Sequence, residues 1–512
     1  MSTTGTDKPD ETSATEPLGP DEVSSDGPAE FSSTYRWIVM GVTVIATFAM
    51  VLDTTIVNIG LPAIQREFGS PDSAELGNIE WVLTAYLAAV GIGQMLTGWL
   101  TDRFGRKRCF VGAFGTFTVA SALCALAPTL GFLVAARILQ GLGGGLLMPV
   151  AMAMIYALFP ASERGRALGM FGIAVMAAPA IGPVLGGWIT SSFGWRWIFS
   201  VNVPVGLIGV PLAIAMLRSD PGDPKRELDT VGLVLSTVGL SLLMIGFAQG
   251  EKSWVSLTTI GCLAAGVGLL VAFALHSLRT PVPLVELRVF ANPVFSLAMV
   301  ILGLMAVAQY ARLVYIPLEL SHIWGLAESK IGLVMLPSAL GMAVTMPIGG
   351  RIVDRLGARI PVGVGCSIFA LSYLGLVFFV SEGTSQWVVS GWLGLGGLGG
   401  GLAMMAPNIQ ALNSVKSSLV SQATGLSSVT RQISTAVGVA VLSSIFGSAV
   451  MSAPGGRNDI GPYRLMFMIG AALFVVCAVL GQFLPNRTRA RELQLDRQAE
   501  AEEFAFMAAE VG

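Results

Sequence analysis

The sequence is poor in charge: Asp, Glu, Lys and Arg make up only 12% of its 512 residues, whereas 53% are hydrophobic. Soluble domains carry about 25% charged residues, so this chain lacks the polar material that covers a water-exposed surface. The formal net charge of −2 provides no positive field for nucleic acid. The composition excludes a soluble enzyme, a secreted disulfide scaffold and a disordered chain, and it predicts a membrane protein.

Groups suited to metal, redox and phosphate chemistry are scarce as well. Two histidines, His276 and His322, are too few for a histidine-built metal site. The five cysteines are scattered without a C-x-x-C pair, which is typical of small buried hydrophobes. No G-x-x-x-x-G-K-S/T phosphate loop and no nucleophile–base arrangement occur. We therefore expect no metal, no cofactor, no direct use of ATP and no enzymatic activity.

Long apolar runs are what the sequence has instead. A membrane-spanning helix needs about 20 mostly apolar residues, and fourteen such runs are bounded by charged or turn residues. Their approximate limits are 37–60, 81–101, 109–128, 130–158, 167–190, 197–217, 230–249, 257–276, 294–318, 331–350, 360–380, 387–411, 422–447 and 463–484. The chain is therefore predicted to be an all-α polytopic membrane protein.

The distribution of basic residues predicts the orientation of these spans. With the N-terminus inside, 21 of the 30 Lys and Arg residues fall in inner segments, 6 in outer loops and 3 within spans. Inner loops carry the basic excess in membrane proteins, so both termini are expected to be cytoplasmic. The acidic residues 1–36 are expected to be a disordered tail without the features of a signal peptide. Residues 485–512 form a second cytoplasmic tail.

The chain also repeats itself. A glycine, an aspartate and a basic cluster recur 252 positions apart, and two glycine-rich segments, 143–146 and 399–402, recur at an offset of 256. The two loop copies are Gly98-x-x-x-Asp102-Arg103-x-Gly105-Arg106-Lys107-Arg108 and Gly350-x-x-x-Asp354-Arg355-x-Gly357-Ala358-Arg359. Repeated halves packed around a central site are a transporter architecture.

The duplication divides the chain into two six-helix bundles, 37–217 and 293–484. The spans at 230–249 and 257–276 contain neither repeated motif, so 218–292 is interpreted as an inserted two-helix hairpin with its linkers.

The repeated loop has two interpretations. Positive-inside anchoring explains its basic residues, which would face anionic headgroups. It does not explain an aspartate at the same place in both copies, Asp102 and Asp354. A carboxylate that pairs with a neighbouring helix in one conformation and releases it in another explains that position.

These motifs resemble the major facilitator superfamily, and within it the fourteen-helix drug:proton antiporters. The matching segments are the loop after the second span, Leu52–Pro62 in the first span, Arg137-x-x-Gln140-Gly141-x-Gly143-Gly144, Gly182-Pro183-x-x-Gly186-Gly187, and Gly194–Phe199 ahead of Asn202 and Pro204. The resemblance covers roughly residues 37–485 and implies a cavity lined by the first, fourth and ninth spans. The sequence departs from the repeat where Ala358 replaces Lys107, and no second-half arginine corresponds to Arg137.

Ionisable residues inside the spans are functional candidates, because a charge at bilayer depth costs at least about 2.5 kcal/mol. Counting 1.5 Å per residue puts Asp53, Arg137 and Arg312 each about 10 Å below the outer boundary, so these three charges can meet. Asp53 is the only acid well inside the apolar runs, which makes it the expected proton carrier with Arg137 as its partner. A static pair that fixes helix packing is the alternative.

Four further residues, Arg312, Tyr315, Glu319 and Arg431, are candidates for substrate binding or gating. The first three share one helix face, and Glu319 lies near the outer end, where we expect a solvated carboxylate. For Arg431 a packing or hydrogen-bonding role is the alternative. In the Gly182–Gly187 segment close packing of small residues is one interpretation. The family resemblance implies instead a bend that controls leak and exchange direction.

The sequence therefore predicts a proton-coupled exporter of small amphipathic, drug-like compounds that works by alternating access. It is expected to act as a monomer in a bacterial cytoplasmic membrane, with protons, a small-molecule substrate and the bilayer as its partners. A dedicated transporter of an endogenous metabolite or lipid is one alternative. A membrane sensor that keeps the fold without transport is the other.

Overall fold

A computed structural model describes residues 32–68, 81–160, 163–220, 222–250, 254, 256–326, 328–381, 383–416 and 419–485. All regular structure in these ranges is helical, and 13 of the described helices are long and apolar enough to cross a membrane. The proposed tails lie almost entirely outside the described residues, except that residues 33–36 already belong to the first helix.

The helices follow the fourteen predicted spans. The first half comprises α1 (Ser33–Phe68), α3 (Trp81–Phe104), α4 (Arg106–Ala125), α5 (Leu130–Leu158), α6 (Arg164–Phe193), and α7 (Arg196–Ser200) continuing into α8 (Asn202–Met216). The segment interpreted as an inserted hairpin contains α9 (Thr230–Gly250) and α10 (Leu257–Arg279), followed by a short 3-10 turn, η1 (Leu287–Ala291). The second half comprises α11 (Pro293–His322), α12 (Glu328–Leu356), α13 (Arg359–Phe379), α14 (Gln386–Ala403) continuing into α15 (Ala406–Asn413), α16 (Val420–Ser452) and α17 (Gly461–Gly481). The glycines and the two prolines of the fifth span do not interrupt α6, which is a single helix of 30 residues.

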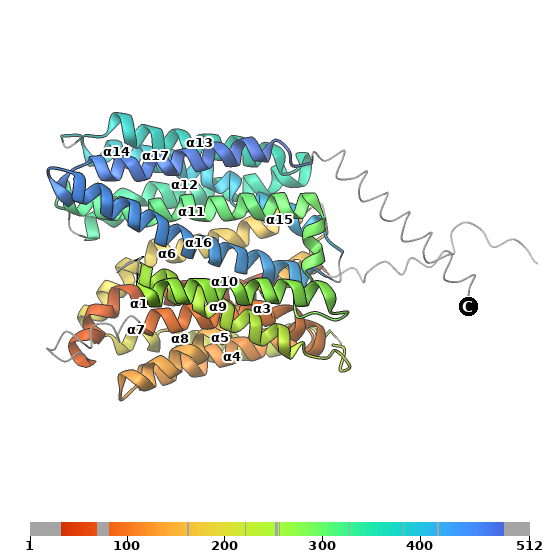
Figure 1. Cartoon of the computed structure of the whole chain (residues 1–512). Helices are drawn as coiled ribbons and strands as arrows, with labels where there is room; N and C mark the ends of the chain where they lie inside the picture. The colour runs from red at the N-terminus through yellow and green to blue at the C-terminus, as the bar shows by residue number, and fades with distance from the viewer. Residues whose placement is uncertain are drawn as a thin grey trace, which may run out of the picture.

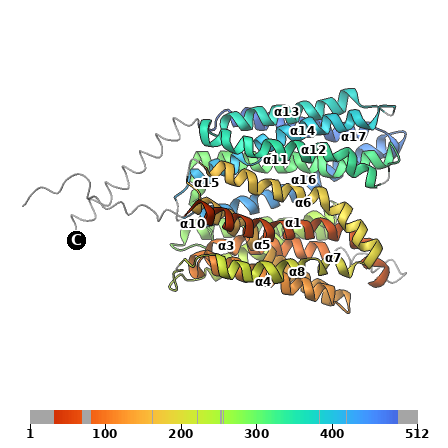
Figure 2. The same ribbon diagram turned by 180° about the vertical axis from the view of Figure 1, so that it is seen from behind.

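The helices lie side by side in two groups (Figures 1 and 2), with the second half above the first in Figure 1. α1 begins and α17 ends at the same end of the bundle, which we call the terminal end. Three contacts lie at this end. Arg36 approaches Glu163 at 3.8 Å within the first half, and Arg359 donates to Gln482 within the second. The amide of Gly165 donates to Asp354 between the halves.

Glycines allow the helices of each half to touch. A Cβ on Gly143 of α5 would lie 2.8 Å from the carbonyl oxygen of Ala113 in α4. In the second half, a Cβ on Gly401 of α14 would lie 2.6 Å from the carbonyl oxygen of Met342 in α12. The two repeated glycine-rich segments are therefore contact surfaces within the halves, where the absence of side chains brings backbones together.

Two seams join the halves, and each contains one copy of the repeated loop. At one seam α3 packs against α16, where a Cβ on Gly98 would collide with Gln422. At the other seam α12 packs against α6, where a Cβ on Gly350 would collide with the carbonyl of Gly165. The internal duplication thus puts equivalent glycines at equivalent contacts between the halves.

The inserted hairpin lies along the α3–α16 seam and touches both halves. Met95 of α3, Leu240 and Met244 of α9, and Val429 of α16 form one buried apolar cluster. The linker before α9 is tied to the first loop copy, since Arg103 donates to the carbonyl oxygen of Arg226 at 2.9 Å. Arg103, one of the basic residues for which headgroup anchoring is an interpretation, therefore also binds this linker.

Candidate functional site

Asp53 and Arg137 form a buried ion pair in the first half. Nη1 of Arg137 in α5 lies 2.7 Å from Oδ2 of Asp53 in α1, and both side chains are fully buried. Two of the three charges predicted at one depth therefore do meet.

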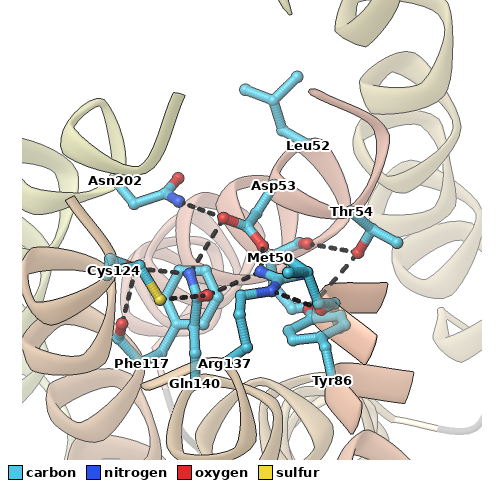
Figure 3. A network of polar contacts seen from close by, with 12 residues as sticks. Met50, Leu52, Asp53, Thr54, Tyr86, Phe117, Cys124, Arg137, Gln140 and Asn202 are labelled. Carbon is cyan, nitrogen blue, oxygen red and sulfur yellow. Dashed lines mark hydrogen bonds and ion pairs between the residues drawn. The ribbon is translucent and has the colours of Figure 1, made fainter. Parts of the chain in front are cut away.

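Two amide side chains complete the surroundings of the Asp53 carboxylate (Figure 3). Asn202 of α8 and Gln140 of α5 donate to Oδ1 at 2.7 and 3.0 Å. Both residues belong to the sequence motifs, but the motifs by themselves predict no role for either. For Gln140 a signal existed, because its position three residues after Arg137 puts both side chains on one helix face.

The partners of Asp53 are themselves held in place. Gln140 accepts from Nη1 of Arg137 at 2.7 Å and donates to Ser121 of α4 at 2.8 Å. Nε of Arg137 donates to the carbonyl of Val82 in α3, and its guanidinium carbon lies 3.8 Å from the centre of the Tyr86 ring. The network therefore draws on α1, α3, α4, α5 and α8.

The surroundings of the Asp53 carboxylate depend on how three helices sit relative to one another. Asp53 receives three donors from two helices other than its own. Hydrogen bonds and a cation directed at a carboxylate favour its ionised form. A shift of α5 or α8 relative to α1 would therefore remove donors from this carboxylate.

The small-residue segment of α6 packs beside Asp53. A Cβ on Gly182 would collide with Thr55 of α1, and one on Gly186 would lie 3.2 Å from Cα of Ile56. Gly187 has no atom within 4 Å of its Cβ position, so close packing accounts for two of the three glycines. The side chain of Pro183 lies outside the described residues.

Arg312 does not reach the Asp53 network. It lies in α11 of the second half, with its guanidinium carbon 5.1 Å from the centre of the Phe369 ring. Its Nη1 has no hydrogen-bond partner within the described part of the chain. The expectation that the three charges meet was wrong for Arg312, because equal depth in the membrane says nothing about which half a helix belongs to.

Glu319 is buried, and the expectation of a solvated carboxylate was wrong. Its exposure is 1%, and Tyr315 one turn earlier is 2% exposed. The rings of Tyr315, Phe446 and Tyr463 pack in succession, with centres 4.7 and 5.1 Å apart, so α16 and α17 cover this end of α11. The described residues offer no hydrogen-bond partner to Oε2 of Glu319.

Arg431 lies at the contact between the two halves. Its Nη2 is 3.2 Å from the sulfur of Met148, which belongs to α5 of the first half. Among the described residues, neither Asp53 nor Glu319 lies within ion-pair distance of Arg431.

The two repeated aspartates bind the opposite half at the terminal end. Asp102 accepts from Nε2 of Gln422 in α16 at 3.2 Å. Asp354 accepts from the backbone amides of Gly165 and Arg166 at 2.7 and 3.0 Å, at the N-terminus of α6, where a helix attracts negative charge. The predicted pairing with a neighbouring helix is present in both copies.

The rest of the loop copies shape the turn and the surface. Gly105 and Gly357 have φ of 81° and 85°, a left-handed backbone that glycine adopts without strain. The amide of Arg106 donates to Asp220 at 3.0 Å, and Arg355 is exposed. These positions therefore support the loop rather than the Asp53 network.

Another ion pair of α1 lies at the end opposite the terminal end. Nη1 of Arg196 is 2.6 Å from Oε1 of Glu67, and Nε1 of Trp195 donates to Oε2 at 2.6 Å. The hydrogen bond from Trp195 lowers the pKa of Glu67 most, and the hydrogen bond from Arg196 lowers it further. Both side chains of this pair are about 40% exposed. Because Glu67 lies on the same helix as Asp53, the pair is a solvated counterpart to the buried pair of Asp53 and Arg137.

Comparisons with known proteins agree with this architecture. The sequence profile described as the Major Facilitator Superfamily matches residues 43–439. Multidrug resistance protein Stp of Mycobacterium tuberculosis (strain CDC 1551 / Oshkosh) is 32% identical over 413 residues, covering 79% of this chain and 76% of that protein. Multidrug transporter protein MdtP of Bacillus subtilis (strain 168) is 30% identical over 430 residues, covering 84% and 77%. Among solved structures, the proton:xylose symporter XylE bound to 6-bromo-6-deoxy-D-glucose matches with a TM-score of 0.63, covering 89% of this chain and 97% of that one. Sequence identity to XylE is 14%, so this likeness shows the fold alone.

Proposed function

This chain belongs to the major facilitator superfamily, and we propose that it is a proton-coupled exporter of small amphipathic compounds. The observation that carries the proposal is the Asp53 network: a carboxylate inside the membrane, fully buried, whose donors come from α5 and α8. The names of relatives such as Stp and MdtP support a drug-like substrate.

The proposed cycle links the state of Asp53 to the opening of the two ends. With Asp102 and Asp354 bound to the opposite half, the terminal end is held together. In the proposed orientation this end faces the cytoplasm, so the substrate would leave through the opposite end. Proton binding to Asp53 weakens its bonds to Arg137 and Asn202 and allows the halves to rearrange. Release of that proton to the cytoplasm then drives the return.

The proposal includes no cofactor, because the proton gradient supplies the energy. It places a monomer in the cytoplasmic membrane of a bacterium with both termini inside. The residues proposed for coupling are Asp53 and Arg137, and the contacts of Gly182 and Gly186 with α1 would transmit movements of α6 to them.

Proteoliposomes test the proposal directly. Purified protein is reconstituted with a pH-sensitive dye inside, a proton gradient is imposed, and a panel of amphipathic compounds is added one at a time. We expect substrate-evoked proton movement with several compounds. Movement with one metabolite or lipid only would favour a dedicated transporter, and no movement with folded protein would favour a sensor.

Asn202→Ala is expected to reduce proton-driven accumulation of substrate roughly tenfold. The variant removes the hydrogen bond from α8 to the Asp53 carboxylate, and such a bond to a charged group contributes about 1.5–3 kcal/mol. Movement of α8 would then no longer act on the proposed proton carrier, so the gradient would drive transport less effectively.

Ser121→Ala is the matched control, because Ser121 contacts Gln140 and not Asp53. Accumulation of one labelled compound in proteoliposomes under an imposed proton gradient measures the effect. Wild-type accumulation in Asn202→Ala, or an equal loss in both variants, would show that the hydrogen bond from Asn202 to Asp53 has no part in coupling.

A further inference from the structure

Arg431 carries a positive charge in the middle of the surface where the two halves meet. It is the twelfth residue of the 33-residue helix α16, so at 1.5 Å per residue it lies about 17 Å from the start of that helix. Its side chain is only partly buried, and its guanidinium extends from the second half to Met148 of the first half. The charge therefore faces the region between the halves rather than the interior of one bundle.

This guanidinium has no acidic partner among the described residues. The buried acids among the described residues are Asp53 and Glu319, and neither lies within the 4.0 Å of an ion pair with Arg431. Asp53 is already bound by three donors of its own half. The sulfur of Met148 is only a weak acceptor.

An unpaired cation at this depth is costly, and such residues mark the paths of substrates and ions. The five donors of a guanidinium form a rigid fork that matches a carboxylate or a similar planar anion. Met148 beside it is 4% exposed in this conformation, and its flexible apolar side chain can adapt its shape to a ring system when the halves separate. A cationic compound in the same place would instead be repelled by Arg431.

We propose that Arg431 binds the acidic group of the transported compound, so that amphipathic organic anions such as aryl carboxylates are the favoured substrates. The inference rests on the proposed export function and narrows its substrate class. It also predicts the charge balance. If one proton enters on Asp53 as one monovalent anion leaves, two charges move per cycle. Exchange of a proton for a monovalent cation moves none.

The test uses three compounds that share one aromatic skeleton: naphthylacetate, its primary amide and the corresponding amine. Binding to purified protein in detergent is measured by calorimetry, and proton movement is measured in proteoliposomes. We expect wild type to prefer the carboxylate. Arg431→Gln is expected to weaken carboxylate binding at least tenfold and amide binding less than twofold. The carboxylate affinity of Arg431→Lys is expected to lie between those of wild type and Arg431→Gln, because lysine keeps the charge but lacks the forked donors of a guanidinium.

Gln432→Ala is the control, since it changes the neighbouring residue of α16 and keeps the charge. An equal loss for all three compounds in Arg431→Gln would mean a structural role and would overturn the inference. So would a wild-type preference for the amine, or no binding of the carboxylate.

Failure of the export function gives a different result. Proton movement evoked by the amine or amide but not by the carboxylate leaves the exporter standing and removes the role of Arg431. Carboxylate binding that depends on Arg431 without any proton movement leaves the anion site standing and removes proton coupling.

Discussion

Asp53→Asn is expected to reduce proton-driven accumulation of substrate at least tenfold while leaving substrate exchange across the membrane close to the wild-type rate. Asparagine has nearly the same shape and keeps one oxygen to accept from Arg137, Gln140 or Asn202. It cannot bind and release a proton, so the protein would still change conformation with substrate but would no longer be driven by the gradient. Accumulation and counterflow of one labelled compound in proteoliposomes separate the two activities.

Glu67→Gln is the matched control for this variant. Glu67 lies on the same helix and also pairs with an arginine, Arg196, but the pair is about 40% exposed. We expect Glu67→Gln to keep coupled accumulation. Wild-type accumulation by Asp53→Asn would exclude Asp53 as the proton carrier. Equal loss of accumulation, exchange and folded protein would instead support a static pair that fixes packing.

Arg137→Met is expected to destabilise the folded protein by about 3–5 kcal/mol, because it leaves the Asp53 carboxylate buried without its cation. Both side chains of the pair are fully buried, so water does not replace the lost partner. The double variant Asp53→Asn with Arg137→Met is expected to recover much of that loss, since it removes the uncompensated charge. Thermal unfolding of purified protein in one detergent measures both effects.

Arg196→Met provides the comparison for an exposed pair, for which we expect a loss of at most about 1 kcal/mol. If Arg137→Met alone were as stable as the double variant, Asp53 would carry no charge in the folded protein. The ion pair in the network would then not be the resting state of the site.

The spans and the repeat were predictable because both can be read along the sequence, without knowledge of which residues meet in space. An apolar run long enough to cross a bilayer is visible without knowledge of its neighbours, and all fourteen predicted spans coincide with observed helices. The two loop copies were recognisable from spacing alone. The structure adds that Gly98 and Gly350 sit at equivalent seams.

The site was only partly predictable because its members come from separate helices. Depth along a span predicted that Asp53 and Arg137 share a level, but it predicted the same of Arg312, which lies in the other half. Asn202 joins Asp53 across 149 positions of sequence, and nothing in its local pattern indicates that contact. Glu319 is buried at the end of α11 that α16 and α17 cover. The sequence of α11 does not indicate which helices pack beside it.

The most direct test of the central claim is infrared difference spectroscopy of the purified protein, recorded while the pH is lowered. This measurement detects the protonated carboxyl group itself and needs no knowledge of the substrate. The other acidic residues among the 32 Asp and Glu of the chain become protonated in both proteins and cancel when their spectra are subtracted. If Asp53 is the proton carrier, the wild-type spectrum minus that of Asp53→Asn will contain a protonated carboxyl band that grows as the pH falls. A band of the same size and pH dependence in Asp53→Asn would contradict the assignment and show that another group takes up the proton.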